Sequence, residues 1–157
     1  MTDRGVVGST IEIGGRLSER AIFDLLAAAE EDRAVLGGRQ VEYDEEDLRL
    51  AVAAGAPLRF TRAHAAAEEF VELEAFCRAE RLVYRRFGDG GPSGQAGVLF
   101  WAPGREAGQR APADARGRVY LTLAELDDAG ARGLDLGAVL AQLRERSGQV
   151  PPLVFVA

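Results

Sequence analysis

LRFTRAHAAAEEFVELEAFCRAERLVYRRF, residues 58–87, is the stretch with the clearest structural pattern in the chain. Within it, Leu58 and Phe60 flank a polar residue, an alternation that is typical of a half-buried strand. Apolar residues then recur at helical spacing and predict a helix over residues 65–80, and Leu82–Phe87 again alternates like a strand. Strand, helix and strand at this spacing predict a βαβ unit, in which a right-handed crossover joins two parallel strands.

The rest of the chain predicts further strands and helices around this unit. Short alternating or apolar runs predict strands at residues 11–13, 39–43, 98–101, 119–121 and 153–156, with loops at 88–97 and 105–117. Helices are predicted to begin behind the N-cap residues Ser18, Asp44, Thr122 and Asp135. A length of 157 residues suits one domain, so we expect residues 1–157 to form a single globular domain of the α/β or α+β class. We expect a mixed sheet with the βαβ unit at its centre and the helices packed on it.

The charge and the choice of basic residue exclude several chemistries. The chain carries 25 acidic and 19 basic residues, a formal net charge of −6, and every basic residue is Arg. Without Lys there is no Schiff base, no pyridoxal-phosphate anchor and no P-loop lysine. Nonspecific nucleic-acid binding requires a dense basic surface, so we expect no direct nucleic-acid binding.

The cysteine count and the hydropathy pattern favour the cytoplasm. Cys77 is the one cysteine, so no intrachain disulfide forms and no oxidising compartment is required. The segment Met1–Ile13 lacks the charged and then apolar layout of a signal peptide, and no apolar run approaches the ~20 residues that span a bilayer. We therefore expect a cytoplasmic protein without a membrane partner.

Acid–base residues in and near the predicted helix define an enzyme alternative. His64, the only histidine, has no neighbour at metal-ligand spacing, and a surface or capping role is favoured for it. Glu69 and Glu74 flank the apolar stripe of the helix on opposite sides, which favours a solvated edge with Glu74 paired to Arg78. A hydrolase or transferase needs at least two of these side chains, or Arg85, in one pocket.

No motif in the sequence predicts a cofactor, a metal site or a catalytic nucleophile. Cys77 shares the apolar stripe with Phe70 and Leu73, which favours core packing over a reactive thiol. The loop 88–97 contains no Gly-Lys-Ser/Thr and opens no helix, so it fails the tests for a phosphate loop and a nucleophile elbow. Helix capping is favoured over a calcium loop for Asp127, Asp128 and Asp135.

The candidate binding residues are Arg85, Arg86, Trp101 and Arg105. They close two predicted strand segments just before long loops, so neighbouring strand ends would place them together on one rim. Trp and Arg are enriched at binding hot spots, and Arg is well suited to binding carboxylate or phosphate groups. The alternative is that Trp101 fills the core while the arginines pair with surplus carboxylates.

Three segments, FVELEAFC at residues 70–77, LVYRR at 82–86 and FWAPG at 100–104, provide a helix, a strand and an aromatic-x-Pro-Gly turn. In this order they resemble a group of uncharacterised bacterial proteins associated with plasmids and other mobile elements. The resemblance covers residues 70–104 and implies an accessory function of mobile DNA, without catalytic residues. Where that group has an acidic, Tyr-rich strand, this chain has Gly90–Gly97.

The function favoured by the sequence is a non-catalytic protein-interaction module with an unidentified protein partner. Short Gly- and Arg-rich loops beside a Trp suit such a contact surface. One alternative is the small enzyme described above. The other is an acidic inhibitor that mimics nucleic acid on a nucleic-acid-handling or defence complex, which requires a continuous carboxylate face. In the sequence the carboxylates are largely interleaved with arginines, so this alternative ranks below the others.

Overall fold

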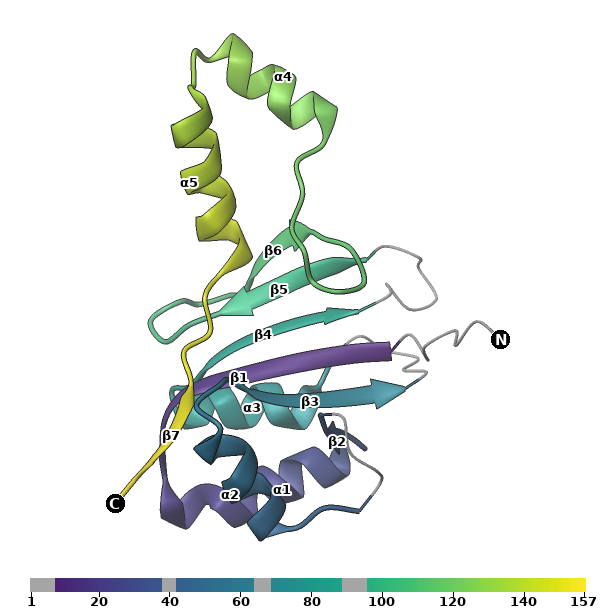
Figure 1. Cartoon of the computed structure of the whole chain (residues 1–157), viewed down its shortest axis with the longest axis vertical. Helices are drawn as coiled ribbons and strands as arrows, with labels where there is room; N and C mark the ends of the chain where they lie inside the picture. The colour runs from purple at the N-terminus through teal and green to yellow at the C-terminus, as the bar shows by residue number, and fades with distance from the viewer. Residues whose placement is uncertain (1–7, 38–41, 64–68, 89–95) are drawn as a thin grey trace.

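The computed structural model describes residues 8–37, 42–63, 69–88 and 96–157, and its centre is a seven-stranded sheet. Six strands follow the order β2-β3-β1-β4-β5-β6, in which every neighbouring pair is antiparallel (Figure 1). The seventh, β7, pairs in parallel with the second half of β1. The bounds are β1 (Gly8–Ser18), β2 (Val35–Leu36), β3 (Leu58–Ala63), β4 (Val83–Gly88), β5 (Gly97–Trp101), β6 (Gln109–Pro112) and β7 (Leu153–Val156). The predicted class, a mixed sheet with packed helices, is confirmed.

The predicted βαβ unit is present, but a further strand runs between its two strands. β3 and β4 are each antiparallel to β1, so they run parallel to one another, and helix α3 (Val71–Ala79) connects them. β1 lies between them, with Ile11 opposite both Phe60 and Arg86. The N-terminal strand therefore occupies the centre of the sheet.

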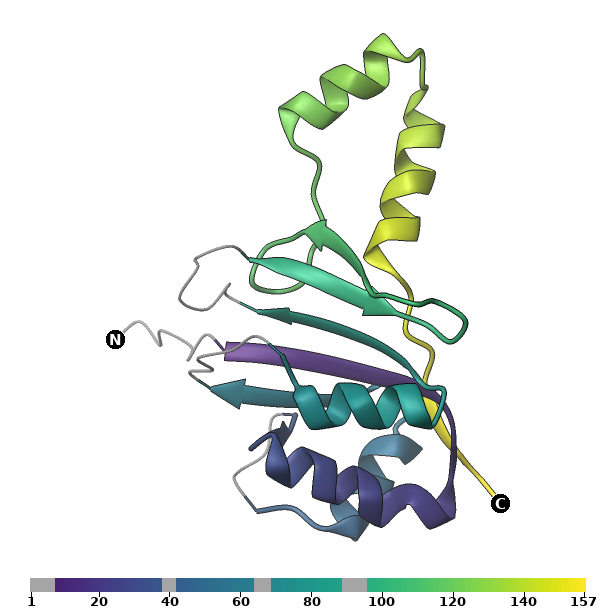
Figure 2. The same cartoon turned by 180° about the vertical axis from the view of Figure 1, so that it is seen from behind.

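Two helices, α1 (Ile22–Glu31) and α3, cover one face of the sheet (Figure 2). A short 3₁₀ turn, η1 (Glu19–Ala21), leads from β1 into α1. Alternate residues of a strand point to the same face, so the strand register places Ile13, Tyr84 and Trp101 side by side. All three are buried and belong to the main core, together with apolar residues of α1 and α3.

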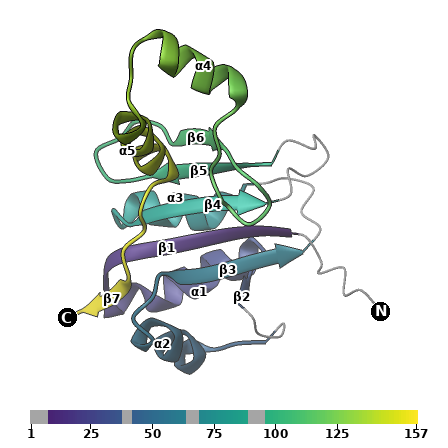
Figure 3. The same cartoon turned by 45° about the horizontal axis from the view of Figure 1, so that its top comes forward.

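The opposite face of the sheet is partly covered at its two ends. At one end α2 (Glu45–Ala53) packs beside β7. At the other end α4 (Leu123–Ala131) and α5 (Leu136–Ser147) form an arm that extends beyond β6 (Figures 1 and 3). A second, smaller apolar cluster lies among β5, β6 and the loop that follows β6, and its buried members are Val98, Ala111 and Ala113.

The predicted N-caps all act as caps. The side chains of Asp44 and Thr122 each accept a hydrogen bond from a backbone N–H of the first turn, and each forms a reciprocal capping box. Asp135 caps α5, while Ser18 caps η1 rather than α1 directly. Short polar side chains fix these helix starts locally, which is why the sequence alone predicts them.

Three predicted boundaries differ from the structure. β6 lies inside the predicted loop 105–117, because it pairs with β5 through its backbone and lacks a clear apolar alternation. The predicted strand 119–121 makes only one bridge, from Val119 to Ala113, in the described part of the chain. Residues 39–41 of another predicted strand, and residues 65–68 of the predicted helix, lie outside the described residues.

Candidate functional site

Trp101, the centre of the predicted binding rim, lies in the core. Its side chain is only 6% exposed and stacks on Tyr84, with ring centroids 5.7 Å apart. The indole N–H donates a hydrogen bond of 3.1 Å to the carbonyl oxygen of Arg105, which satisfies its one polar atom. The alternative in which Trp101 fills the core is therefore the one that the structure shows.

Arg86 lies on the same buried face and pairs with Glu74 of α3. Its Nε is 2.6 Å from Glu74 Oε1. Glu74 also accepts hydrogen bonds from the Phe70 backbone N–H and the Tyr84 hydroxyl, each at 3.3 Å. Burial raises the pKa of Glu74 above its ordinary value, and the Arg86 guanidinium opposes that rise. A solvated edge was predicted for Glu74, and that prediction is wrong.

The error comes from the packing of the helix. The buried residues of α3 are Leu73, Glu74 and Cys77, so Glu74 shares the side of the helix that faces the sheet. Arg78, the predicted partner of Glu74, instead donates a hydrogen bond of 2.9 Å to the Tyr84 hydroxyl. Glu74 is thus a buried acceptor that joins α3 to β4.

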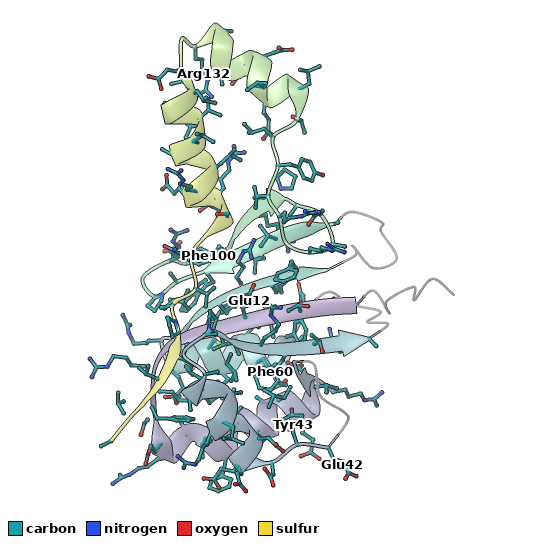
Figure 4. The ribbon with its side chains drawn as sticks, in the orientation of Figure 1. Glu12, Glu42, Tyr43, Phe60, Phe100 and Arg132 are labelled. Atoms are coloured by element: carbon teal, nitrogen blue, oxygen red, sulfur yellow. The ribbon has the colours of Figure 1, made fainter. Side chains whose placement is uncertain are left out.

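Arg85 projects from the opposite face of the sheet, because consecutive strand residues alternate. Its Nη1 lies 3.4 Å from Glu12 Oε1, its Nε donates to the Ser147 carbonyl at 2.9 Å, and its Nη2 donates to the Gly117 carbonyl. Figure 4 shows Glu12 on β1, between α2 and the arm. Arg85 therefore connects the centre of the sheet to the foot of the arm.

Arg105 lies in the loop between β5 and β6. It is exposed and donates a hydrogen bond of 2.9 Å to Gln109, and its guanidinium carbon lies 5.3 Å from the Phe100 ring centroid. The structure therefore does not gather the four predicted residues on one rim. Partner binding by Arg85 and Arg105 stays a prediction.

Of the residues of the enzyme alternative, Glu69 and Glu74 both contact Arg86, while Arg85 lies apart from them in the described part of the chain. Glu69 is exposed and its Oε1 is 3.9 Å from Arg86 Nη2, whereas Arg85 lies across the sheet. His64 lies outside the described residues. Cys77 is fully buried, as predicted, and burial raises the pKa of its thiol well above the ordinary value.

Metal-ligating groups and membrane-spanning helices are considered for the described residues. Among them, no group of three or more His, Cys, Asp or Glu side chains is placed to hold a metal ion. None of the helices in these segments combines the length and apolar character needed to cross a membrane.

The arm carries a surface that the sequence did not single out. α4 and α5 form a V-shaped helical hairpin, and its helices bury only Ala129 and Val139 (Figures 1 and 2). Four leucines on these helices remain exposed: Leu123 (74%), Leu126 (48%), Leu136 (71%) and Leu140 (40%). Leucines at this spacing normally belong to a core, so their exposure is informative.

Helical geometry places these leucines on one side of the hairpin. At 100° per residue, Leu123 and Leu126 lie about 60° to 120° around the axis of α4 from the buried Ala129. Leu136 and Leu140 lie within the same range of angles around the axis of α5 from the buried Val139, and in the same rotational sense. Because the two helices run in opposite directions, equal offsets bring both pairs to the same side. We call this surface, formed by Leu123, Leu126, Leu136 and Leu140, the leucine face.

Charged residues line the hollow between the two helices of the arm. Arg132 Nε lies 3.0 Å from Asp128 Oδ2, and Arg146 Nη1 lies 2.9 Å from Glu125 Oε1. Hydrogen bonds from the Thr122 backbone N–H and from Arg146 lower the pKa of Glu125 below its ordinary value. These charges therefore pair within the arm, and the leucine face lies outside the hollow that they line.

Comparison of the chain with protein-family models, with curated proteins and with solved structures finds no match in any of the three. The resemblance of residues 70–104 to plasmid-associated bacterial proteins therefore stays a prediction.

Proposed function

We propose that this protein is a non-catalytic protein-interaction module that binds an amphipathic helix of another protein on its leucine face. The observation that carries this proposal is the exposure of four leucines on one side of a two-helix arm. An apolar surface of this kind, bordered by polar residues, is typical of a protein–protein interaction site.

Burial of these leucines supplies the driving force. Removing one leucine side chain from water contributes about 1.5–3 kcal/mol. Leu123 and Leu136 are the most exposed of the four, so a partner that covers them gains the most. Part of that gain offsets the entropy lost when two proteins associate.

The geometry favours a helix as the occupant. Leu123 and Leu126 form one row on α4, and Leu136 and Leu140 form another on α5. A third helix can pack its own apolar stripe against two such rows, with contacts at every third or fourth residue. The occupant is another protein rather than a second copy, because a net charge of −6 on each copy opposes self-association.

The resemblance of residues 70–104 bears on where the partner is encoded. It supports a partner encoded on a plasmid or another mobile element, with the interaction taking place in the cytoplasm. This part of the proposal is separable from the leucine face, because the leucine face lies outside residues 70–104.

The test compares two variants that each replace exposed apolar residues by Gln. The arm variant carries Leu126→Gln, Leu136→Gln and Leu140→Gln, and the control variant carries Phe23→Gln and Leu50→Gln, which replace exposed apolar residues elsewhere. Full-length native protein is used to capture partners from cells of the source organism. Each captured protein is then purified and its Kd is measured by calorimetry against all three chains.

We expect the arm variant to weaken binding at least about 100-fold, as for loss of several hot-spot residues, while the control retains native affinity. Circular dichroism establishes that both variants fold. Equal affinity for the arm variant and the native chain contradicts the proposal. Self-association of the native chain that disappears in the arm variant, seen by light scattering, contradicts the choice of another protein as occupant.

A further inference from the structure

An arginine-lined hollow lies between the loop after β6 and the last turn of α5. These two segments meet at the foot of the arm (Figures 1 and 3). The volume of the hollow is about 430 Å³. We call it the arginine hollow, and the residues that line it are Arg85, Arg116, Gly117, Arg118, Val119, Leu143, Arg144 and Ser147. Four of the eight are arginines and none is acidic.

Two of the arginines already have carboxylate partners, and these carboxylates do not line the hollow. Arg85 pairs with Glu12 at 3.4 Å, and Arg118 Nε lies 2.6 Å from Asp114 Oδ2. Two positive charges are thereby balanced from outside the hollow. Arg85 and Arg118 therefore add no net positive charge to the hollow.

The other two arginines, Arg116 and Arg144, have no ion-pair partner among the described residues. Both are exposed and line the same hollow from opposite walls, one on the loop and one on α5. Like charges placed together in this way repel one another unless an anion lies between them. The hollow therefore carries an uncompensated positive charge in a protein whose net charge is −6.

The walls of the hollow are held in place. Arg85 donates hydrogen bonds to the Gly117 carbonyl on the loop and to the Ser147 carbonyl at the end of α5. This side chain joins both walls to the sheet, so the backbone of the two walls is held in place before an anion binds. Preorganisation of this kind reduces the entropic cost of binding.

We propose that the arginine hollow binds an oxyanion of the phosphate class. Its arginines come from a strand, a loop and a helix, and so approach from several directions. One arginine fork matches the two coplanar oxygens of a carboxylate, whereas a tetrahedral phosphate presents oxygens to several donors at once. The proposal does not depend on a partner for the leucine face.

The experiment is an NMR titration of the ¹⁵N-labelled full-length chain. The probes are inorganic phosphate, glycerol 3-phosphate and acetate, each added at an ionic strength held constant with sodium chloride. We expect both phosphates to cause saturable shifts in the backbone signals of Gly117, Val119 and Ser147. The double variant Arg116→Gln, Arg144→Gln should bind at least about tenfold more weakly, because it loses charged hydrogen-bond donors.

A matched control removes the same charge elsewhere. Arg16 and Arg20 are exposed and lie outside the hollow, so Arg16→Gln, Arg20→Gln should leave the titration unchanged. Tighter binding of glycerol 3-phosphate assigns the site to an organic phosphate, and equal affinity assigns it to the free anion; both support the proposal. It is overturned if phosphate causes no saturable shift, if acetate binds as well as phosphate, or if the two double variants respond alike.

Discussion

The Arg86 and Glu74 side chains form an ion pair in the interior, with Arg86 Nε 2.6 Å from Glu74 Oε1. The pair joins β4 to α3. Breaking a buried pair by removing one partner leaves an unpaired buried charge and costs about 3–5 kcal/mol. Removing both partners together avoids most of that penalty.

A double-mutant cycle tests this coupling. We expect Arg86→Met and Glu74→Leu each to lower the free energy of unfolding by about 3–5 kcal/mol. The double variant should lose clearly less than the sum of the two, because neither charge is then left alone. Urea unfolding of the four proteins measures the free energies, and strictly additive losses would exclude a coupled pair.

The pH dependence of the free energy of unfolding should reveal the raised pKa of Glu74. Burial raises its pKa above the ordinary value of 4.5, so the folded state holds this proton more strongly than the unfolded state. The contribution of Glu74 to stability is therefore fully present below pH 4.5 and is lost as pH rises through the folded pKa. As pH rises from 4.5 through the folded pKa of Glu74, the free energy of unfolding of the native chain should fall relative to that of Glu74→Gln. Urea unfolding at several pH values measures this difference, and a rise instead of a fall would contradict the prediction.

Trp101 should matter for folding. Replacing a buried Trp by Ala costs about 3–5 kcal/mol. We therefore expect Trp101→Ala to be strongly destabilised, with Trp101→Phe affected less because it retains stacking on Tyr84. Thermal unfolding followed by circular dichroism checks this order. A stable Trp101→Ala chain would show that the indole does not support the core.

The thiol of Cys77 should be inert in the native state. It is fully buried, and burial raises its pKa well above the ordinary value of 9.0, so little thiolate forms. A chromogenic disulfide reagent at pH 8 should react with the Cys77 thiol only after urea has unfolded the protein. Fast labelling of the folded protein would mean that α3 opens readily.

Much of the fold follows from local signals in the sequence. The helix starts at Asp44, Thr122 and Asp135 depend on side chains one turn away, and these are visible in the sequence. The centre of the sheet depends on distant segments. A strand is predicted at residues 11–13, but β1 continues through Gly14 and Gly15 to Ser18.

The C-terminal segment explains these glycines. A Cβ at Gly14 would lie 1.7 Å from the Pro151 carbonyl oxygen, so only glycine allows that segment to pass and β7 to pair with β1. Gly15 also has a φ of 118°, which other residues rarely adopt. A close contact between residues so far apart in the chain leaves no local signal.

The candidate site was harder to predict than the fold. Arg85 and Arg86 are adjacent in sequence, yet strand alternation sends them to opposite faces. Glu74 lies on the buried side of α3, where it pairs with Arg86 of β4, and that tertiary partner is not visible in the sequence of the helix. The leucine face has the spacing of a core stripe, and only the tertiary arrangement shows that nothing in the described chain covers it.

Site-specific photo-crosslinking in the source organism tests the leucine face most directly. A photoreactive phenylalanine analogue replaces Leu126 or Leu136 on the arm, or Leu50 on α2 as a control at another exposed leucine. Our account predicts that both arm positions crosslink to one and the same protein and that position 50 does not. Crosslinks to that protein from position 50 alone, or no crosslink from either arm position, would contradict it.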